Sequence, residues 1–250
     1  MRTTASVRRS FLLTLAVLTS STLVISGCGG SHKKDAKTKA PSPTSATPSP
    51  VPTFNRSQVN AALLKADDIR SGIKQIPVVL DQVRENKLPL CSLTGMKLPG
   101  TPQLITRQFT NKVLGKDQFQ YTQLVALYAD AGAASAAFST VTQALGKCPA
   151  KHHAPPRQLA NNRTVLAHDD TWKSSNTAIG QWPHVQAIEQ QTVSPDATKY
   201  NAYHFIYDYA WRGNLMFASV YVQRTAPKDS TAPIIQQASG ILQKQLGKFG

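Results

Sequence analysis

The clearest pattern of hydrophobic and polar positions lies near the end of the chain and predicts a β-hairpin. Residues 199–224 read KYNAYHFIYDYAWRGNLMFASVYVQR, in which Gly213-Asn214 forms a turn between two β-rich runs. Alternation then places a hydrophobic set on one face: Tyr203, Phe205, Tyr207, Tyr209, Trp211, Met216, Ala218, Val220 and Val222. The other face is mixed and carries His204, Asp208, Arg212 and Ser219 among Ile206, Phe217 and Tyr221.

Two further strands are predicted upstream of this hairpin. In residues 117–130, DQFQYTQLVALYAD, Phe119 and Tyr121 alternate before a continuous apolar run. Residues 185–193, VQAIEQQTV, predict a second strand. The other signals between residues 149 and 198 are weak, because Trp172 and Trp182 stand isolated among polar residues.

Three segments have helical spacing. Near the start of the folded part, Ser57 is a suitable N-cap for a helix with Val59, Ala62 and Leu63 on one side. Asp130 caps a second helix that ends at Gly146, and one face of it carries Ala134, Phe138, Val141 and Leu145. The last helix is capped near Ser230 and turns inward Ile234, Ile235, Ala238, Ile241 and Leu242. The pattern therefore predicts an α+β domain with two or three helices packed on one face of an antiparallel sheet.

The first residues have the pattern of an export signal. Arg2, Arg8 and Arg9 precede the apolar run FLLTLAVLTSSTLVI, which is shorter than the roughly 20 residues that a membrane span needs. Residues 25–28, ISGC, resemble the bacterial lipobox. That resemblance implies cleavage after residue 27 and a diacylglycerol thioether on Cys28, and two acyl chains such as palmitate suffice for stable anchoring at the outer face of the cell membrane. An uncleaved membrane helix and a freely secreted protein are the alternatives.

A linker separates this lipidation site from the folded part. Residues 31–39, SHKKDAKTK, are basic, and residues 40–53, APSPTSATPSPVPT, have too few apolar residues to form a core. We therefore divide the chain into a signal peptide at 1–27, a lipidated linker at 28–53 and one domain at 54–250.

The net charge narrows the choice of partners. Removing the signal peptide takes away three of the 28 basic residues and none of the 13 acidic ones, so the charge falls only from +15 to +12. An exported basic chain meets anionic lipid head groups and phosphate-rich wall polymers. No DNA or RNA recognition motif is visible, so we expect no nucleic-acid partner.

The cysteines predict one disulfide. With Cys28 lipidated, Cys91 and Cys148 remain as the internal pair, and export favours their oxidation. A reactive thiol or a metal site is the alternative, since His152 and His153 follow Cys148, but this spacing matches no zinc pattern.

The sequence contains no catalytic motif, and we expect neither enzymatic activity nor a cofactor or metal. Glu85 and Glu189 are the only glutamates, so a pair of catalytic carboxylates would require tertiary proximity. Residues 168–170, HDD, are interpreted as a solvated turn rather than a metal site.

The candidate ligand-binding residues lie in the hairpin: His204, Asp208, Trp211 and Arg212. Successive members of the row His204, Asp208 and Arg212 are about 13 Å apart at the strand rise, which is too far for a triad. The alternative is an ordinary half-exposed sheet face. If a cleft exists, its polar entrance is expected near Trp211 and Arg212.

Several stretches together resemble one family. They are NAALLKADDI, YTQLVALYADAGAASAAF between the two cysteines, and an RGN hairpin before the last helix. These stretches are similar to the extracellular sensor domain of the PknH-type actinobacterial serine/threonine kinases, which also occurs in lipoproteins. The resemblance implies an antiparallel sheet flanked by helices and a cleft for an unidentified ligand. The family pattern has a second disulfide, for which this chain has no cysteines, and Cys91 and Cys148 would match the first.

The sequence therefore predicts a membrane-anchored lipoprotein whose domain binds a small molecule or an anionic wall polymer. Because the chain contains no kinase, any signal output would need a protein partner. An envelope protein-interaction module is the alternative function, and a hydrolase with a dispersed site is a third.

Overall fold

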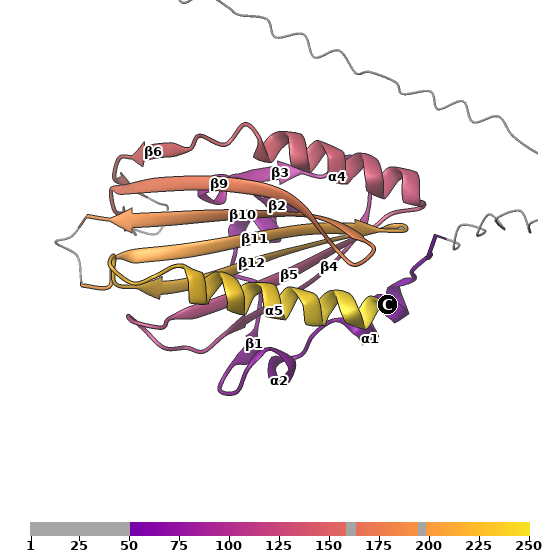
Figure 1. Cartoon of the computed structure of the whole chain (residues 1–250), viewed down its shortest axis with the longest axis horizontal. Helices are drawn as coiled ribbons and strands as arrows, with labels where there is room; N and C mark the ends of the chain where they lie inside the picture. Colours follow the sequence, from indigo (N-terminus) through magenta and orange to yellow (C-terminus); the bar gives the residue numbers. More distant parts are fainter. Residues whose placement is uncertain (1–50, 159–163, 195–198) are drawn as a thin grey trace, which may run out of the picture. The chain divides into compact units, whose positions relative to one another are not determined.

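The computed structural model describes residues 51–158, 164–194 and 199–250 (Figure 1). All of them belong to one compact unit that spans Pro48–Gly250. The signal peptide, Cys28 and almost all of the linker lie outside the described residues, so their assignments stay predictions. None of the described helices has the length and apolar character needed to cross a bilayer.

An eight-stranded antiparallel sheet forms the centre of the domain. Its order is β1 (Lys74–Ile76), β4 (Gln103–Thr110), β5 (Phe119–Leu127), β12 (Leu215–Thr225), β11 (Ala202–Arg212), β10 (Trp182–Val193), β9 (His168–Ile179) and β6 (Lys151–Ala154). Two small sheets pair β2 (Lys87–Pro89) with β3 (Gly95–Lys97) and β7 (Arg157–Gln158) with β8 (Thr164–Val165). The helices are α1 (Arg56–Ala62), α2 (Ala66–Ile69), α3 (Asp81–Arg84), α4 (Ala131–Leu145) and α5 (Ala232–Phe249), with a 3-10 turn at Cys91–Leu93. The predicted α+β class and antiparallel sheet are confirmed.

The predicted hairpin is the pair β11 and β12, with its turn at Gly213-Asn214. Trp211 pairs with Met216, and Tyr207 pairs with Val220, so the two predicted faces are correct. Gly213 has φ +57°, and a Cβ there would overlap the carbonyl oxygen of Pro52. Glycine is therefore required at this position both by its backbone conformation and by the close approach of the chain.

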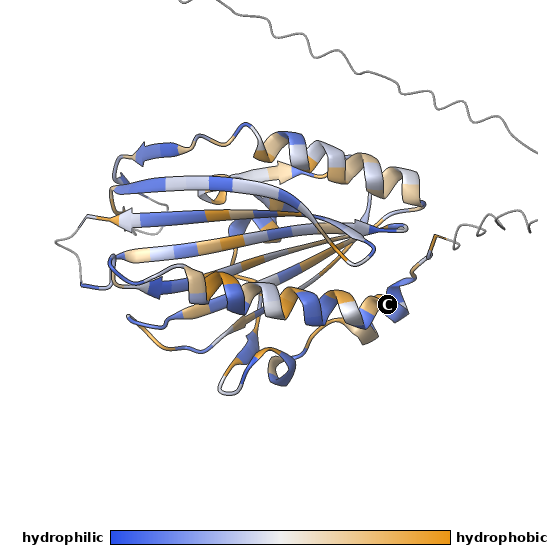
Figure 2. Cartoon of the chain, in the orientation of Figure 1, coloured by the Kyte–Doolittle hydropathy of each residue, from blue (hydrophilic) through white to orange (hydrophobic). Residues whose placement is uncertain are grey.

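Helices cover both faces of the sheet, so the prediction that they share one face is wrong. The α4 helix packs with the Tyr207 and Tyr209 side of the sheet. The α1 and α5 helices pack with the Ile206, Phe217 and Tyr221 side. Figure 2 shows hydrophilic and hydrophobic positions interspersed along α5. Because the second face of the hairpin contains enough apolar side chains, it also supports a core under α5.

The helix ends follow the predicted capping chemistry at α4 but not at α1. The Asp130 side chain accepts a hydrogen bond from the Ala133 backbone N–H at 2.8 Å, and the helix ends at Gly146, as predicted. At α1 the N-cap is Asn55 rather than Ser57, because Asn55 forms a reciprocal capping box with Gln58. At α5 the Ala232 N–H donates to the Ser230 hydroxyl at 3.2 Å, near the predicted cap.

The region with weak sequence signals forms two long strands. The strand predicted at 185–193 belongs to β10, which starts earlier, at Trp182. Residues 168–170 begin the strand β9, so their interpretation as a turn is wrong. Periodicity could not reveal β9 because its residues 173–178 are polar or small and exposed.

Candidate functional site

The two upstream members of the predicted site are buried rather than open to a ligand. His204 is 0% exposed and Asp208 is 1% exposed, because α5 covers this face. The alternative of a half-exposed sheet face is therefore wrong at these two positions. Trp211 and Arg212 lie at the far end of β11, so the structure does not bring the four predicted residues together.

Both ring nitrogens of His204 are satisfied by hydroxyl groups. Nε2 lies 2.8 Å from Thr225 Oγ1, and Nδ1 lies 3.3 Å from Thr231 Oγ1. Burial lowers the pKa of His204, which favours the neutral ring. His204 thus ties β11 to the end of β12 and to the start of α5.

Asp208 takes part in a polar row that crosses three strands. Its Oδ1 lies 2.9 Å from His184 Nε2 and accepts a hydrogen bond from Gln186 Nε2 at 3.0 Å. His184 Nδ1 lies 2.8 Å from the hydroxyl of Thr177, which is the exposed end of the row. The sequence analysis did not single out His184, because the register that places it near Asp208 spans two strands.

Trp211 and Arg212 do line a pocket of about 220 Å³ at the hairpin turn, together with Val51, Pro52, Gln181, Pro183 and Gly213. The Arg212 guanidinium donates to Gln181 Oε1 at 2.6 Å and stands 5.9 Å from the centre of the Trp182 ring. This pocket is smaller than the 300 Å³ at which ligand sites usually begin.

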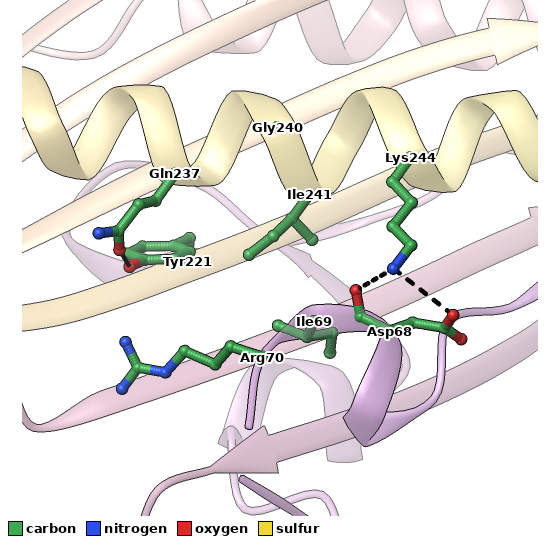
Figure 3. A pocket seen from close by; sticks show the side chains of 8 residues that line it. All are labelled: Asp68, Ile69, Arg70, Tyr221, Gln237, Gly240, Ile241 and Lys244. Atoms are coloured by element: carbon green, nitrogen blue, oxygen red, sulfur yellow. Dashed lines mark hydrogen bonds and ion pairs between the residues drawn. The ribbon is translucent and has the colours of Figure 1, made fainter. Parts of the chain in front are cut away.

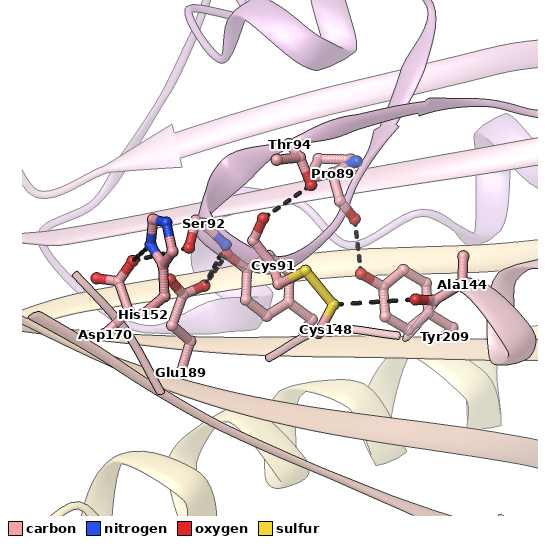
Figure 4. Close-up of a disulfide and its surroundings, with 11 residues drawn as sticks. Pro89, Cys91, Ser92, Thr94, Ala144, Cys148, His152, Asp170, Glu189 and Tyr209 are labelled. Carbon is pink, nitrogen blue, oxygen red and sulfur yellow. Dashed lines mark hydrogen bonds and ion pairs between the residues drawn. A yellow bond between two sulfur atoms is a disulfide. The ribbon is translucent and has the colours of Figure 1, made fainter. Parts of the chain in front are cut away.

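A buried acidic cluster lies on the opposite face of the sheet, beside the disulfide (Figure 4). Asp170 on β9 and Glu189 on β10 are diagonal neighbours, and Ser92 bridges them. The Ser92 hydroxyl donates to Asp170 Oδ2 at 2.7 Å, and the Ser92 backbone N–H donates to Glu189 Oε2 at 2.9 Å. The Tyr207 hydroxyl donates to the same Glu189 oxygen at 2.8 Å. The fold therefore brings the carboxylates of Asp170 and Glu189 close together, as a pair of catalytic carboxylates would require.

The turn that carries Ser92 is fixed by the predicted disulfide, which the structure confirms between Cys91 and Cys148 with a Cα–Cα distance of 5.9 Å. Ser92 and Leu93 have φ of +50° and +51°, a left-handed backbone conformation that residues other than glycine rarely adopt. The disulfide and the bonds from Ser92 to the two carboxylates hold the turn in this conformation.

Two histidines stand on the outer side of the cluster. His152 Nδ1 lies 3.4 Å and His168 Nε2 lies 3.7 Å from Asp170 Oδ2. His152 is half exposed, whereas His168 is largely buried. Within the residues that the structure describes, no group of three or more His, Cys, Asp or Glu side chains is arranged to hold a metal ion.

Protonation of Glu189 gives a testable pH dependence. Burial raises its pKa, and the charge of Asp170 raises it further. The folded state therefore holds this proton more tightly than the unfolded state, so the Glu189 contribution to stability falls as pH rises above the ordinary value of 4.5. Glu189→Gln cannot ionise, so its free energy of unfolding should increase relative to wild type as pH rises. Urea unfolding between pH 4 and pH 8 measures this difference.

The matched control is Glu85→Gln, which changes the other glutamate. Glu85 is exposed, and its pKa is lowered by the hydrogen bond and charge of Lys87. Its variant should show no gain over wild type at the higher pH. A Glu189→Gln variant that loses stability relative to wild type as pH rises would contradict the raised pKa.

A ligand-sized cleft with an apolar floor lies between α2 and α5 (Figure 3). Its volume is about 350 Å³, and its lining residues are Asp68, Ile69, Arg70, Tyr221, Gln237, Gly240, Ile241 and Lys244. Ile69, Ile241 and the Tyr221 ring supply the apolar surface, while Arg70 and Lys244 place two cations at its edge. Sequence analysis missed this cleft because α2 and α5 are separated by more than 150 residues.

The carboxylate of Asp68, which lines the cleft, is paired with a backbone N–H group and with lysines of α5. Asp68 accepts a hydrogen bond from the Lys65 backbone N–H at 2.9 Å and pairs with Lys248 at 2.9 Å, and Lys244 Nζ is 3.6 Å away. The Lys65 bond, followed by Lys248, lowers the pKa of Asp68 to about 2. Asp68 therefore stays ionised at neutral pH and compensates the lysines.

Arg70 is different, because among residues 51–158, 164–194 and 199–250 no carboxylate lies within ion-pair distance of it. Its guanidinium instead stacks 4.4 Å from the centre of the Phe119 ring. Beside it, the Tyr221 hydroxyl contacts the side-chain oxygens of Gln223 and Gln237 at 2.7 Å each, and burial raises the pKa of Tyr221 to about 12. The cleft thus offers a cation over an apolar, uncharged floor.

Comparison with known proteins adds a distant structural similarity. Neither a family model nor a curated protein sequence matches the chain. Among solved structures, the chain is similar to the extracellular domain of PknH from Mycobacterium tuberculosis, with a TM-score of 0.48 and 11% sequence identity, over 80% of this chain and 98% of that chain. A similarity at this level carries no argument about function.

Proposed function

We propose that this protein is a lipid-anchored extracytoplasmic lipoprotein whose domain binds a small ligand with an anionic group, without catalysis. The lipobox-like residues before Cys28 support the anchor, and the Cys91–Cys148 disulfide supports an oxidising compartment. The single observation that carries the binding function is the cleft between α2 and α5, with Arg70 over an apolar floor.

The chemistry of the cleft limits the class of ligand. Its volume of about 350 Å³ is at the small end of ligand sites. Ile69, Ile241 and the Tyr221 ring favour an apolar or aromatic body, and Arg70 favours a carboxylate, sulfonate or phosphate. A ligand of this class would receive a charge-assisted contact and an apolar contact together.

Gly240 allows the cleft to be filled without disturbing the fold. It lies on α5 in the cleft lining, and a Cβ added there meets no atom within 4 Å. We expect Gly240→Leu to weaken binding of the probe 8-anilinonaphthalene-1-sulfonate at least fivefold, because the leucine side chain occupies the cleft. Fluorescence titration of the folded domain measures the dissociation constant.

The matched control is Gly247→Leu, which changes a second open glycine of the same helix outside this cleft. Arg70→Ala should also weaken the probe, whereas Arg84→Ala, which removes an exposed arginine paired with Asp81, should not. Equal binding by Gly240→Leu and Gly247→Leu would exclude the cleft as the probe site.

The anchor is tested separately. Cys28→Ala should yield a chain without lipid, because alanine has no sulfur atom to form the thioether. Mass spectrometry of the wild-type and variant chains measures this difference. A wild-type chain that carries no added lipid mass at Cys28 would refute lipid anchoring.

A second candidate function is hydrolysis by an activated hydroxyl group, and the row Thr177–His184–Asp208 favours it. The hydroxyl, imidazole and carboxylate follow one another at 2.8 and 2.9 Å, as a nucleophile, its base and an orienting acid require. Release of nitrophenol from p-nitrophenyl acetate that disappears in Thr177→Ala would support hydrolysis. Equal rates for the two proteins would leave binding as the function.

A further inference from the structure

The loop between β4 and β5 presents an aliphatic pair to solvent at one end of the sheet. Five large hydrophobic side chains are exposed in the part of the chain that the structure describes, and Val113 and Leu114 are the adjacent ones. Leu114 is 85% exposed, the highest value among the five, and Val113 is 45% exposed. Single exposed hydrophobic residues are common on protein surfaces, but these two adjacent aliphatic side chains form a contiguous apolar tip that is available for a contact.

The conformation of this loop is fixed by its own hydrogen bonds. The Asn111 side chain accepts from the backbone N–H groups of Val113 and Phe119 at 3.2 and 3.1 Å, and donates to the Asp117 carbonyl at 2.7 Å. Gly115 supplies a turn with φ +82°. The aliphatic pair is therefore held outward by a satisfied backbone.

Cations surround the aliphatic pair. Lys112 and Lys116 flank it within the loop, and both are exposed. The register places residues 199–201 and 226–231 at the same end of the sheet, where Lys199 and Lys228 are also exposed. A Cβ at Gly115 would lie 3.6 Å from the Tyr200 ring, so the β4–β5 loop adjoins residues 199–201.

Two carboxylates, Asp117 and Asp229, lie in the same loops. Asp117 Oδ1 accepts from Gln223 Nε2 at 3.4 Å, and Asp229 Oδ2 accepts from the Ala226 backbone N–H at 3.2 Å. The described residues of these loops therefore hold four lysines against two carboxylates, beside an exposed aliphatic tip. An anionic lipid surface complements both features, because acyl chains accept the aliphatic pair and phosphates accept the lysines.

We infer that the β4–β5 loop is a membrane-contact site of the folded domain, in which Val113 and Leu114 enter the interface of an anionic bilayer and Lys112 and Lys116 contact lipid phosphates. This contact is separate from the lipid on Cys28 and from the cleft. It orients the domain by bringing this end of the sheet to the surface.

The test uses residues 48–250, which contain the disulfide, all three hydrophobic clusters and every described element, and which lack Cys28 and the basic linker. Co-sedimentation is measured with vesicles of phosphatidylcholine alone and with added phosphatidylglycerol. We expect binding to the anionic vesicles, at least tenfold weaker for Leu114→Asp and for the double variant Lys112→Glu/Lys116→Glu. The matched control Val79→Asp, at another exposed valine (53%), should bind like wild type.

Each other result overturns the inference. If the wild-type domain binds neither type of vesicle, it has no membrane-contact site. Loss of binding in the lysine variant but not in Leu114→Asp means an ionic contact without insertion. Equal weakening by Val79→Asp means a general effect of added charge. Thermal unfolding at the wild-type temperature confirms that the exposed substitutions leave the fold intact.

Discussion

Replacing Cys91 and Cys148 together by serine is expected to lower the free energy of unfolding by about 4 kcal/mol. The disulfide closes a loop between residues separated by 57 positions. In the loop-entropy model, a link of this span restricts the unfolded chain by about 4 kcal/mol. The substitution also releases the left-handed turn at Ser92 from the end of α4. Urea unfolding of the two proteins at pH 7 measures the difference.

Reduction of the wild-type protein provides the control, because it opens the same loop while both sulfur atoms stay in place. The reduced protein and the double variant should agree to within about 1 kcal/mol, since the entropic effect of the crosslink is common to both. A double variant as stable as the oxidised protein would contradict a structural role for this bond.

Asp208→Ala is expected to cost about 2–4 kcal/mol of stability. The carboxylate is the acceptor for Gln186 Nε2 and the partner of His184 Nε2, and all three side chains lie between β10, β11 and α5. Removing it leaves the buried His184 Nε2 without its partner and leaves Gln186 Nε2 only the contact with Ser239 Oγ at 3.3 Å, and an unpaired buried polar group costs more than the bond itself. Thermal or urea unfolding measures the loss.

Asp208→Asn separates the hydrogen bonds from the charge, since the amide keeps one acceptor oxygen. It should retain more stability than Asp208→Ala. Neither variant should change probe binding in the cleft under conditions where the protein is folded, because Asp208 does not line it. If a folded Asp208→Asn protein binds the probe more weakly than wild type does, Asp208 belongs to the ligand-binding site, as the sequence predicted.

The features that the sequence predicts well are those that short stretches determine. The register of β11 and β12 follows from one turn, Gly213-Asn214, because a period of two fixes every later position. The length of α4 follows from its cap at Asp130 and its end at Gly146. Both signals act within a few residues, so no tertiary information is needed.

The candidate site depends on contacts that no local pattern contains. The polar face with His204 and Asp208 reads as half exposed, yet α5 covers it, and which face a distant helix covers is decided by packing. Asp170 and Glu189 meet through the register of β9, a strand that hydrophobic periodicity does not reveal. The cleft lies between α2 and α5, which are separated in sequence by nearly the whole domain, so only the folded chain brings its lining residues together.

Native mass spectrometry of residues 48–250, purified gently from the organism's own cells or their lysate, tests the binding function most directly. The account predicts an additional mass on the wild-type domain that disappears on unfolding, belongs to an anionic molecule small enough for a cleft of about 350 Å³, and is absent from Gly240→Leu but present on Gly247→Leu. The same additional mass on Gly240→Leu, or wild-type domain that stays bare after incubation with the host extract, would contradict it.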